Sequence, residues 1–284
     1  MFFEDLRTHA LPYQSTPGGG FVLEVQPADT AVTQLIADAL PTTGYGHGML
    51  DDSFRDYMES ALWHLGEGEL HLEIEYFRTD ENATSPTAFQ IHILEPELVA
   101  RRLGRYRYRA RHVDSQGQSR TVDEPIDADT LVVARLPKSL RRQLNRTLAA
   151  IRASDDDILV MSDFTLGKHG QDSGFNFTVF QQMTSDIVLR ATRETGWTGR
   201  SIYTEHCLDP QKAWRAIQFE RLVATLREAA LLGLNEAISR AGVKLGFTAL
   251  LALSGVRKAQ ELDQMERDLD SGTRSMADLL SPGL

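Results

Sequence analysis

Three side chains that could ligate a metal lie close together in the middle of the sequence. Asp163, His169 and Asp172 combine carboxylate oxygens with an imidazole nitrogen, which are donors that hydrolytic metal sites use. Lys168 lies between glycines in the same stretch and could contact a phosphate. The sequence contains neither G-x-x-x-x-G-K-[ST] nor H-E-x-x-H. It therefore favours a glycine-rich surface loop over 167–174, with a metal-dependent hydrolase as an alternative function.

A cysteine nucleophile is the second chemical possibility. Cys207 is the single cysteine of the chain and follows His206 directly. A nucleophile and its base are defined by the positions of their side chains in space, so neighbours in sequence do not by themselves form the pair. We expect Cys207 to be structural, since a lone cysteine forms neither an internal disulfide nor a multi-cysteine metal site. The sequence predicts no catalytic residue, no metal and no cofactor.

A helix that starts at Pro137 has the most uneven charge of the chain. Its apolar stripe is Leu136, Leu140, Leu144, Leu148 and Ile151. Its cations are Lys138, Arg141, Arg142, Arg146 and Arg152, and no acidic residue follows until Asp155. These cations are candidates for contact with double-stranded DNA without sequence specificity, or for pairing with acids of another subunit. A face that is only solvated is the third interpretation.

A second basic patch alternates with tyrosines along a predicted strand. It consists of Arg105, Arg107, Arg109 and Arg111. Arginines suit phosphate oxygens, and tyrosines can stack on bases. The sequence nevertheless favours ordinary cross-strand ion pairs, in which these arginines face Glu69, Glu73 and Glu75 of a neighbouring strand.

A helix that leads into a strand forms the clearest local structure. Apolar residues recur at three and four positions over 53–65, which predicts a helix. Gly66 and Gly68 suit the turn that follows. Residues 69–77 then alternate strictly, which predicts a strand with one core face and one acidic face. The core face is Leu70, Leu72, Ile74 and Tyr76, and the other face is Glu69, His71, Glu73 and Glu75.

The remaining patterns predict an α+β fold. The N-terminal half combines a strand at 21–25, a helix at 31–40 capped by Asp29 or Thr30, and an antiparallel β meander of four strands with a turn at 114–118. The C-terminal half is mainly helical: helices are predicted at 175–195, 210–241, 245–253 and 261–270, with a turn at 155–157 and a short strand at 158–161. We predict an N-terminal arm and helix over 1–50, a wing-like meander domain over 51–136 and a helical domain over 137–284.

Composition indicates a folded protein with local charge separation. Hydrophobic residues make up 42% and charged residues 25% of 284 residues, which is ordinary for a globular chain. No stretch approaches the roughly 20 apolar residues of a membrane span, so we expect an intracellular chain without membrane contact. The formal net charge is −10, whereas 99–152 holds 13 Lys and Arg against 5 Asp and Glu. A basic middle therefore lies within an acidic chain.

The order of these elements resembles that of the portal proteins of tailed phages. Leu62 to Tyr76 is similar to the family's passage from a long helix through glycine into a hydrophobic strand. Leu269 to Leu280, with its Gly272 and Ser275, is similar to the helix joint near the family's C-terminus. No clip insertion between two stem helices can be placed in this sequence.

The resemblance implies a structural protein of the bacteriophage virion, assembled in the host cytoplasm. Such a protein forms a homo-oligomeric ring at a capsid vertex and serves DNA packaging and viral capsid assembly. Its implied partners are further copies of itself, double-stranded DNA, capsid proteins, the packaging motor and tail-connector proteins. An acidic lumen would repel DNA phosphates, and a few cations would touch the backbone. A monomeric nucleic-acid-binding module remains a further alternative.

Overall fold

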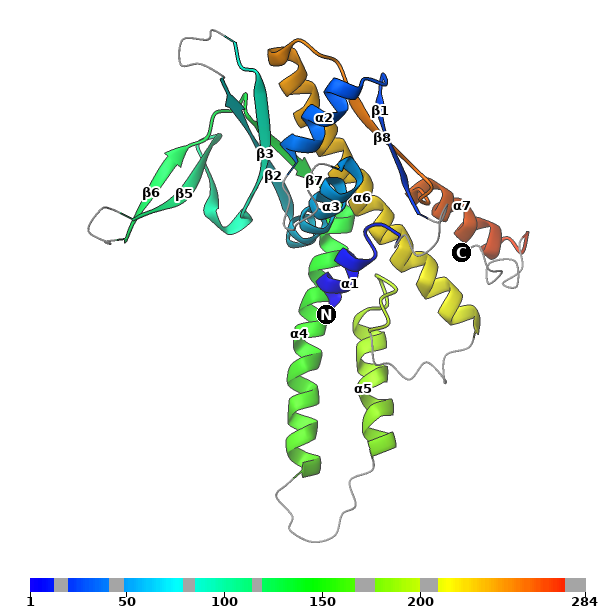
Figure 1. Ribbon diagram of the computed structural model, residues 1–284. Helices are drawn as coiled ribbons and strands as arrows, with labels where there is room; N and C mark the ends of the chain where they lie inside the picture. Colours follow the sequence, from blue (N-terminus) through cyan, green and yellow to red (C-terminus); the bar gives the residue numbers. More distant parts are fainter. Residues whose placement is uncertain are drawn as a thin grey trace. The chain divides into compact units, whose positions relative to one another are not determined.

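The computed structural model describes residues 1–12, 20–40, 49–78, 85–113, 119–166, 177–199 and 209–273. The chain divides into two compact units, each discontinuous in sequence. The first comprises Met1–Phe2, Pro137–Thr225 and Arg257–Leu284, and the second comprises Phe3–Leu136 and Leu226–Val256. The predicted α+β class is confirmed, since antiparallel strands concentrate in the N-terminal half and a long helix lies towards the C-terminus (Figure 1).

The second unit begins with short elements packed around one amphipathic helix. These are α1 (Phe2–Thr8), β1 (Val22–Gln26), α2 (Thr30–Ala39) and α3 (Leu50–Glu67). The predicted cap of α2 is confirmed, because an Asp29 carboxylate oxygen accepts hydrogen bonds from the backbone N–H groups of Ala31 and Val32. The apolar face of α3, which includes Phe54, Tyr57 and Leu65, is buried. Gly68 ends this helix at a φ of 144°.

A three-stranded sheet follows α3, in the order β3-β2-β7. Its strands are β2 (Glu69–Phe77), β3 (Ala88–Leu94) and β7 (Leu131–Arg135), and both pairings of β2 are antiparallel. Leu70, Leu72 and Ile74 are buried, which confirms the predicted core face of β2. The opposite face is less open than predicted: His71 is only 5% exposed. The aromatic ring of Tyr106 covers it, with 5.9 Å between ring centroids.

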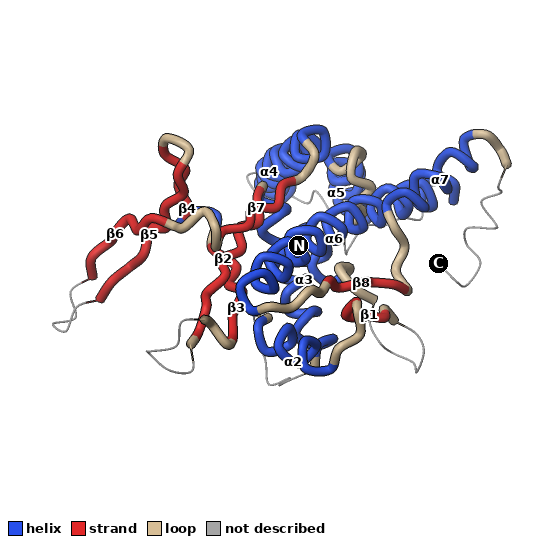
Figure 2. The backbone as a smooth tube through the Cα atoms, turned by 90° about the horizontal axis from the view of Figure 1, so that it is seen from above, coloured by secondary structure: helices blue, strands red, loops and turns tan. Residues whose placement is uncertain are grey.

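The arginine-rich segment forms a separate three-stranded ribbon, so the prediction of one four-stranded meander is wrong. After η1 (Pro96–Leu98), the strands are β4 (Val99–Arg102), β5 (Arg105–Val113) and β6 (Ser119–Pro125), in the order β4-β5-β6. Figure 2 shows this ribbon beside the sheet of β2, β3 and β7. The alternation of single strands does not encode their pairing partners, which tertiary contacts decide. The turn predicted at 114–118 lies outside the described residues.

The long predicted helix is confirmed as α6 (Asp209–Leu245), whose residues up to Thr225 belong to the first unit and whose later residues belong to the second. The helix continues four residues beyond its predicted end at 241. The predicted helix over 245–253 is wrong, since β8 (Leu250–Ser254) is a strand that pairs antiparallel with β1. A short apolar run does not distinguish a buried helix from a strand by periodicity. Asn235 of α6 holds β8 through two hydrogen bonds with the backbone of Leu251, of 2.7 and 3.0 Å.

The first unit is helical in its described part. Helices α4 (Lys138–Leu166) and α5 (Phe177–Ala191) lie side by side and antiparallel (Figure 1). The turn predicted at 155–157 and the strand at 158–161 are wrong, because α4 continues through both. The three aspartates suggested a break, but single-residue propensity is a weak guide against a continuing helix. The helix predicted at 261–270 is confirmed as α7 (Ala259–Asp270), whose Leu262 packs against Ile217 and Ala224 of α6.

Candidate nucleic-acid interface and acidic pocket

The five candidate cations of α4 share one exposed face. At 3.6 residues per turn, Lys138, Arg141, Arg142, Arg146 and Arg152 fall within an arc of about 140°. All five residues are exposed. On the opposite side of the helix, Leu144 and Thr147 are buried. The helical period therefore orients the apolar stripe inward and gathers the cations outward, as predicted.

Part of this cationic face is already neutralised within the first unit. Arg146 Nη1 lies 3.0 Å from a carboxylate oxygen of Glu194, and the Gln143 amide donates a hydrogen bond to the Glu194 backbone carbonyl. Lys138, Arg142 and Arg152 make no ion pair with any acid that the structure describes. We call these three residues the open cationic face. They are spaced along α4 over about 21 Å of helix axis, at 1.5 Å per residue.

The second basic patch does not pair as predicted. Strand β5 lies between β4 and β6, so its arginines do not face β2. Arg109 instead lies 3.5 Å from Asp123 of β6. Arg105 and Arg109 are exposed and Arg107 is half-buried, whereas the side chain of Arg111 is not described. The described arginines therefore lie on the surface of the ribbon and do not join it to the sheet of β2, β3 and β7.

The acids of β2 pair with other residues that sequence reasoning missed. Glu69 accepts a hydrogen bond of 3.0 Å from Arg135 of β7, and Arg135 also donates to the Tyr106 hydroxyl at 2.7 Å. Glu75 lies 2.9 Å from His92 Nε2 on β3. Arg135 stands opposite Glu69 in the strand register, but that register follows from the order β3-β2-β7, which the sequence pattern alone does not give.

The predicted metal donors are not brought together in the described structure. Asp163 lies in α4, and its side chain is not described. His169, Asp172 and the loop at 167–174 lie outside the described residues, as does Cys207. Within the described ranges, no group of three or more His, Cys, Asp or Glu side chains is arranged to hold a metal ion.

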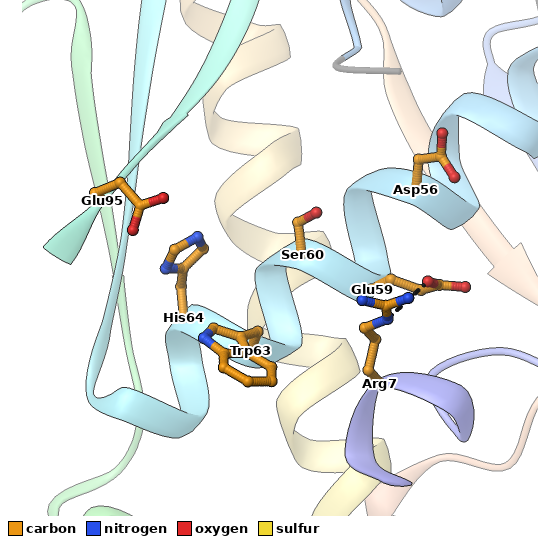
Figure 3. Close-up of a pocket in the computed structure, with 7 residues that line it drawn as sticks. All are labelled: Arg7, Asp56, Glu59, Ser60, Trp63, His64 and Glu95. Carbon is orange, nitrogen blue, oxygen red and sulfur yellow. Dashed lines mark ion pairs between the residues drawn. The ribbon is translucent and has the colours of Figure 1, made fainter. Parts of the chain in front are cut away.

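A pocket of about 380 Å³ opens on the second unit, and its lining combines α1, α3 and the segment after β3. Its lining residues are Arg7, Asp56, Glu59, Ser60, Trp63, His64 and Glu95 (Figure 3). Residues 56, 59, 60, 63 and 64 recur at three and four positions, so one face of α3 supplies most of the wall. The sequence predicted the apolar face of this helix but not the pocket that its polar positions line.

The charge of this pocket is negative. The lining contains three carboxylates and one guanidinium, and Arg7 Nε lies 3.0 Å from Glu59 Oε2. Burial lowers the pKa of His64 below its ordinary 6.5, while Glu95 and Glu67 act in the opposite direction. His64 is therefore mainly neutral near pH 7, and the lining carries a net charge of −2. We call this site the acidic pocket.

The acidic pocket is built for a cation with an apolar neighbour. Trp63 lines it with a side chain that is 40% exposed, and its ring packs on Phe3 at 5.3 Å between centroids. An indole face beside carboxylates attracts guanidinium and ammonium groups. Ser60, His64 and Glu95 are residue types that an acyl-transfer site uses, but no hydrogen bond links them among the described residues, and His64 Nδ1 is buried without a partner. A nucleophile and its base are thus not assembled here.

Comparisons with protein-family models and with curated proteins found no match for this chain. Among the described helices, none has the length and apolar character that crossing a membrane requires. The chemistry of the two surfaces described above is therefore the basis for a functional proposal.

Proposed function

We propose that this protein is a structural, ring-forming subunit, similar to a phage portal protein, through which double-stranded DNA passes. The open cationic face of α4 is the observation that carries the proposal. Lys138, Arg142 and Arg152 are exposed on one helix face, in a chain whose formal net charge is −10. A few cations within an acidic protein fit a surface along which DNA moves, because strong binding requires a basic surface over a whole domain.

The spacing of these cations favours contact with a backbone rather than with bases. Contacts from side chains to phosphates position DNA without reading its sequence. The open cationic face lies on the convex surface of a helix whose first acidic residue is Asp155. We therefore propose binding that depends on salt and is indifferent to sequence.

A closed ring is consistent with the charge distribution of the chain. The segment 99–152 is strongly basic and the remainder is acidic, so each copy carries an excess of opposite charge in different parts of its sequence. Complementary patches on different parts of one surface associate head to tail, and such heterologous contacts form rings when the rotation closes. Capsid, packaging-motor and tail-connector proteins are the partners that the proposed function entails, and the virion is its proposed location.

The assembled mass tests the ring directly. Native mass spectrometry of the full chain, over a range of concentrations and with and without double-stranded DNA, should show one closed multiple of the 31.8 kDa protomer. A strict monomer under every condition would overturn the proposed ring and favour a monomeric nucleic-acid-binding module. An open series of sizes would also contradict a closed ring.

DNA affinity against salt tests the role of α4. In the variant Lys138→Gln/Arg142→Gln/Arg152→Gln, the slope of log affinity against log salt should become shallower by about 0.9 for each DNA phosphate that the variant no longer neutralises. Arg78→Gln/Arg193→Gln is the control, since both residues are exposed and neither lies on α4. An unchanged slope in the triple variant would show that DNA does not contact the open cationic face.

A further inference from the structure

The turn between β4 and β5 breaks a local rule of β-hairpins. Leu103 and Gly104 form a two-residue loop between the paired residues Arg102 and Arg105, with φ values of 51° and 81°. Positive φ at both positions is typical of a type I′ turn, whose first position favours Asn or Asp. A leucine in this conformation is strained. Its side chain gains no burial in return, since Leu103 is 96% exposed.

The residues on either side of the turn add a second unfavourable choice. Arg102 and Arg105 are both exposed and stand directly opposite each other, where like charges repel across a strand pair. Arg101 is held differently, because its guanidinium lies over the Tyr106 ring at 5.5 Å from the centroid. The hairpin tip, which we define as Arg102–Arg105, therefore presents one apolar side chain between two cations.

Strain, exposed apolar surface and like-charge repulsion at one apex are typical of a binding site. Such local conflicts persist where function requires them. A surface that relieved all three would need carboxylates for Arg102 and Arg105, next to an apolar group for Leu103. Within the described part of this chain, nothing covers Leu103.

The acidic pocket has this complementary chemistry. Asp56 and Glu95 supply carboxylates at opposite ends of its lining, and Trp63 supplies an exposed aromatic surface between those ends (Figure 3). The pocket has a volume of about 380 Å³ and can admit the side chain at the apex of the tip. The open cationic face fits it less well, because its cations are spread along a convex helix. Arginine and aromatic anchors buried in a partner's pocket contribute most to the affinity of protein interfaces.

We propose that the hairpin tip of one copy inserts into the acidic pocket of the next copy, with Leu103 against Trp63 and the two arginines against Asp56 and Glu95. This inference rests on the proposed ring, and it assigns the contact that closes it. Both surfaces belong to the second compact unit, so every copy carries one tip and one pocket. A contact between two different patches is heterologous, and its repetition forms a ring when the rotation between copies closes.

Nucleic acid is the competing occupant of the hairpin tip. Its phosphates could satisfy Arg102 and Arg105, but a phosphate backbone offers no apolar surface to Leu103. The acidic pocket offers both. If the hairpin tip proves to bind DNA instead, this result would contradict its insertion into the acidic pocket of the next copy.

Reversing the charges of the two surfaces tests their direct contact. Arg102→Glu/Arg105→Glu and Asp56→Lys/Glu95→Lys should each reduce the association constant by about tenfold or more. A chain that carries all four substitutions should assemble again, because the signs match once more. Arg78→Glu/Arg193→Glu is the matched control and should leave assembly unchanged. Assembly that persists in both double variants would overturn the inference while the proposed ring survives.

A crosslinking experiment covers the case in which a charge variant fails to fold. In a Cys207→Ser background, chains with Leu103→Cys are mixed with chains with Ser60→Cys and treated with a short bismaleimide. A crosslink between two chains is expected, and none should form when Val243→Cys, at a highly exposed position of α6, replaces Ser60→Cys. Rings without the Leu103–Ser60 crosslink would overturn the docked arrangement alone. Loss of DNA binding in Arg102→Glu/Arg105→Glu with unchanged assembly would contradict the insertion of the tip into the pocket and would favour nucleic acid as the occupant. A chain that never assembles would overturn the ring and the interface together.

Discussion

The Tyr57 hydroxyl of α3 donates a hydrogen bond of 2.9 Å to the backbone carbonyl oxygen of Ala230 in α6. Tyr57 is fully buried, and burial raises the pKa of its phenol far above the ordinary value. The phenol is therefore neutral at pH 7 and donates its proton in the hydrogen bond to Ala230. One polar atom thus fixes the position of α3 against α6 inside an apolar core.

We predict that Tyr57→Phe lowers the free energy of unfolding by about 1 kcal/mol, because a buried hydrogen bond is lost. Urea denaturation, with an unchanged m-value, measures this difference. Tyr76→Phe is the matched control, since the Tyr76 hydroxyl is buried without a hydrogen-bond partner among the described residues. Its removal should be neutral or slightly stabilising. Equal losses in the two variants would show that the bond to Ala230 contributes nothing specific.

Gly233→Ala should destabilise the second unit although alanine favours helices. A Cβ at Gly233 would lie 2.9 Å from the Cβ of Ala134 on β7, which is closer than two carbons can approach. The steric cost of overpacking, about 1–3 kcal/mol, should exceed the roughly 1 kcal/mol gained in helix propensity. The double variant Gly233→Ala/Ala134→Gly should be less unstable than the sum of the two single variants. Additive effects in thermal or urea unfolding would contradict a direct clash.

Arg215 is predicted to be essential for the stability of the first unit. Its buried guanidinium donates to the backbone carbonyls of Leu189 and Trp197 and to Thr192 Oγ1, at 2.7–3.1 Å. Arg215→Met should cost about 2–4 kcal/mol, because several buried acceptors lose their donor together. Arg215→Lys should recover only part of this loss, since an ammonium group cannot reproduce the fork. If Arg215→Lys restored the full free energy of unfolding, the positive charge rather than the guanidinium geometry would be responsible for the stabilisation.

Stability should fall as the pH is lowered from about 7 towards 5, and His71 should contribute to that fall. Burial lowers the pKa of His71 below its ordinary 6.5, and Arg135 and His64 act in the same direction while Glu69 opposes them. The unfolded chain then binds the proton more readily than the folded chain. Protonation therefore favours unfolding at pH values below the pKa that His71 has in the unfolded chain. Above that pKa both states are neutral, and the full stability is present.

The variant His71→Gln isolates this contribution. The difference in unfolding free energy between wild type and variant should shrink as the pH drops from 8 to 5, and His64→Gln should add a further part, because burial also lowers the pKa of His64. Burial raises the pKa of Glu73, so protonation of this residue favours the folded state, which is the opposite of the effect of His71. Wild type and variant both contain Glu73, so comparing them at the same pH cancels its effect. A difference that stays constant with pH would show that His71 does not gain its proton on unfolding.

Local periodicity predicted the elements whose patterns are long and regular. The cap of α2 and the helices α3 and α6 follow from residue types and spacing within one segment, and the alternation of residues 69–77 identified β2 with its core face. The pairing of the strands could not be predicted in the same way. The alternation of arginines along β5 does not indicate that its neighbours are β4 and β6. For the same reason β8 was not predicted as a strand, because it forms one only by pairing with β1 from the other end of the sequence.

The candidate site was predictable only where it is contained in a single element. The cationic face of α4 could be read from one helix, since its charges and its apolar stripe share the same period. The acidic pocket could not, because Glu95 meets the α3 residues only through the folding of β2 and β3. Leu103 carried a weak signal in the sequence: a leucine stands before glycine where Asn or Asp is typical of a two-residue hairpin.

The pairing of β1 with β8 also constrains how the chain acquires its fold during synthesis. Val22 stands opposite Ser254, and the second unit joins Phe3–Leu136 to Leu226–Val256. Until the later segment leaves the ribosome, β1 has no strand to pair with and Tyr57 has no Ala230 carbonyl to bind. The helical segments that begin at Pro137 can form in the meantime from local contacts. The N-terminal half is thus made first and completed last, so a nascent chain that stops before residue 226 exposes the apolar face of α3.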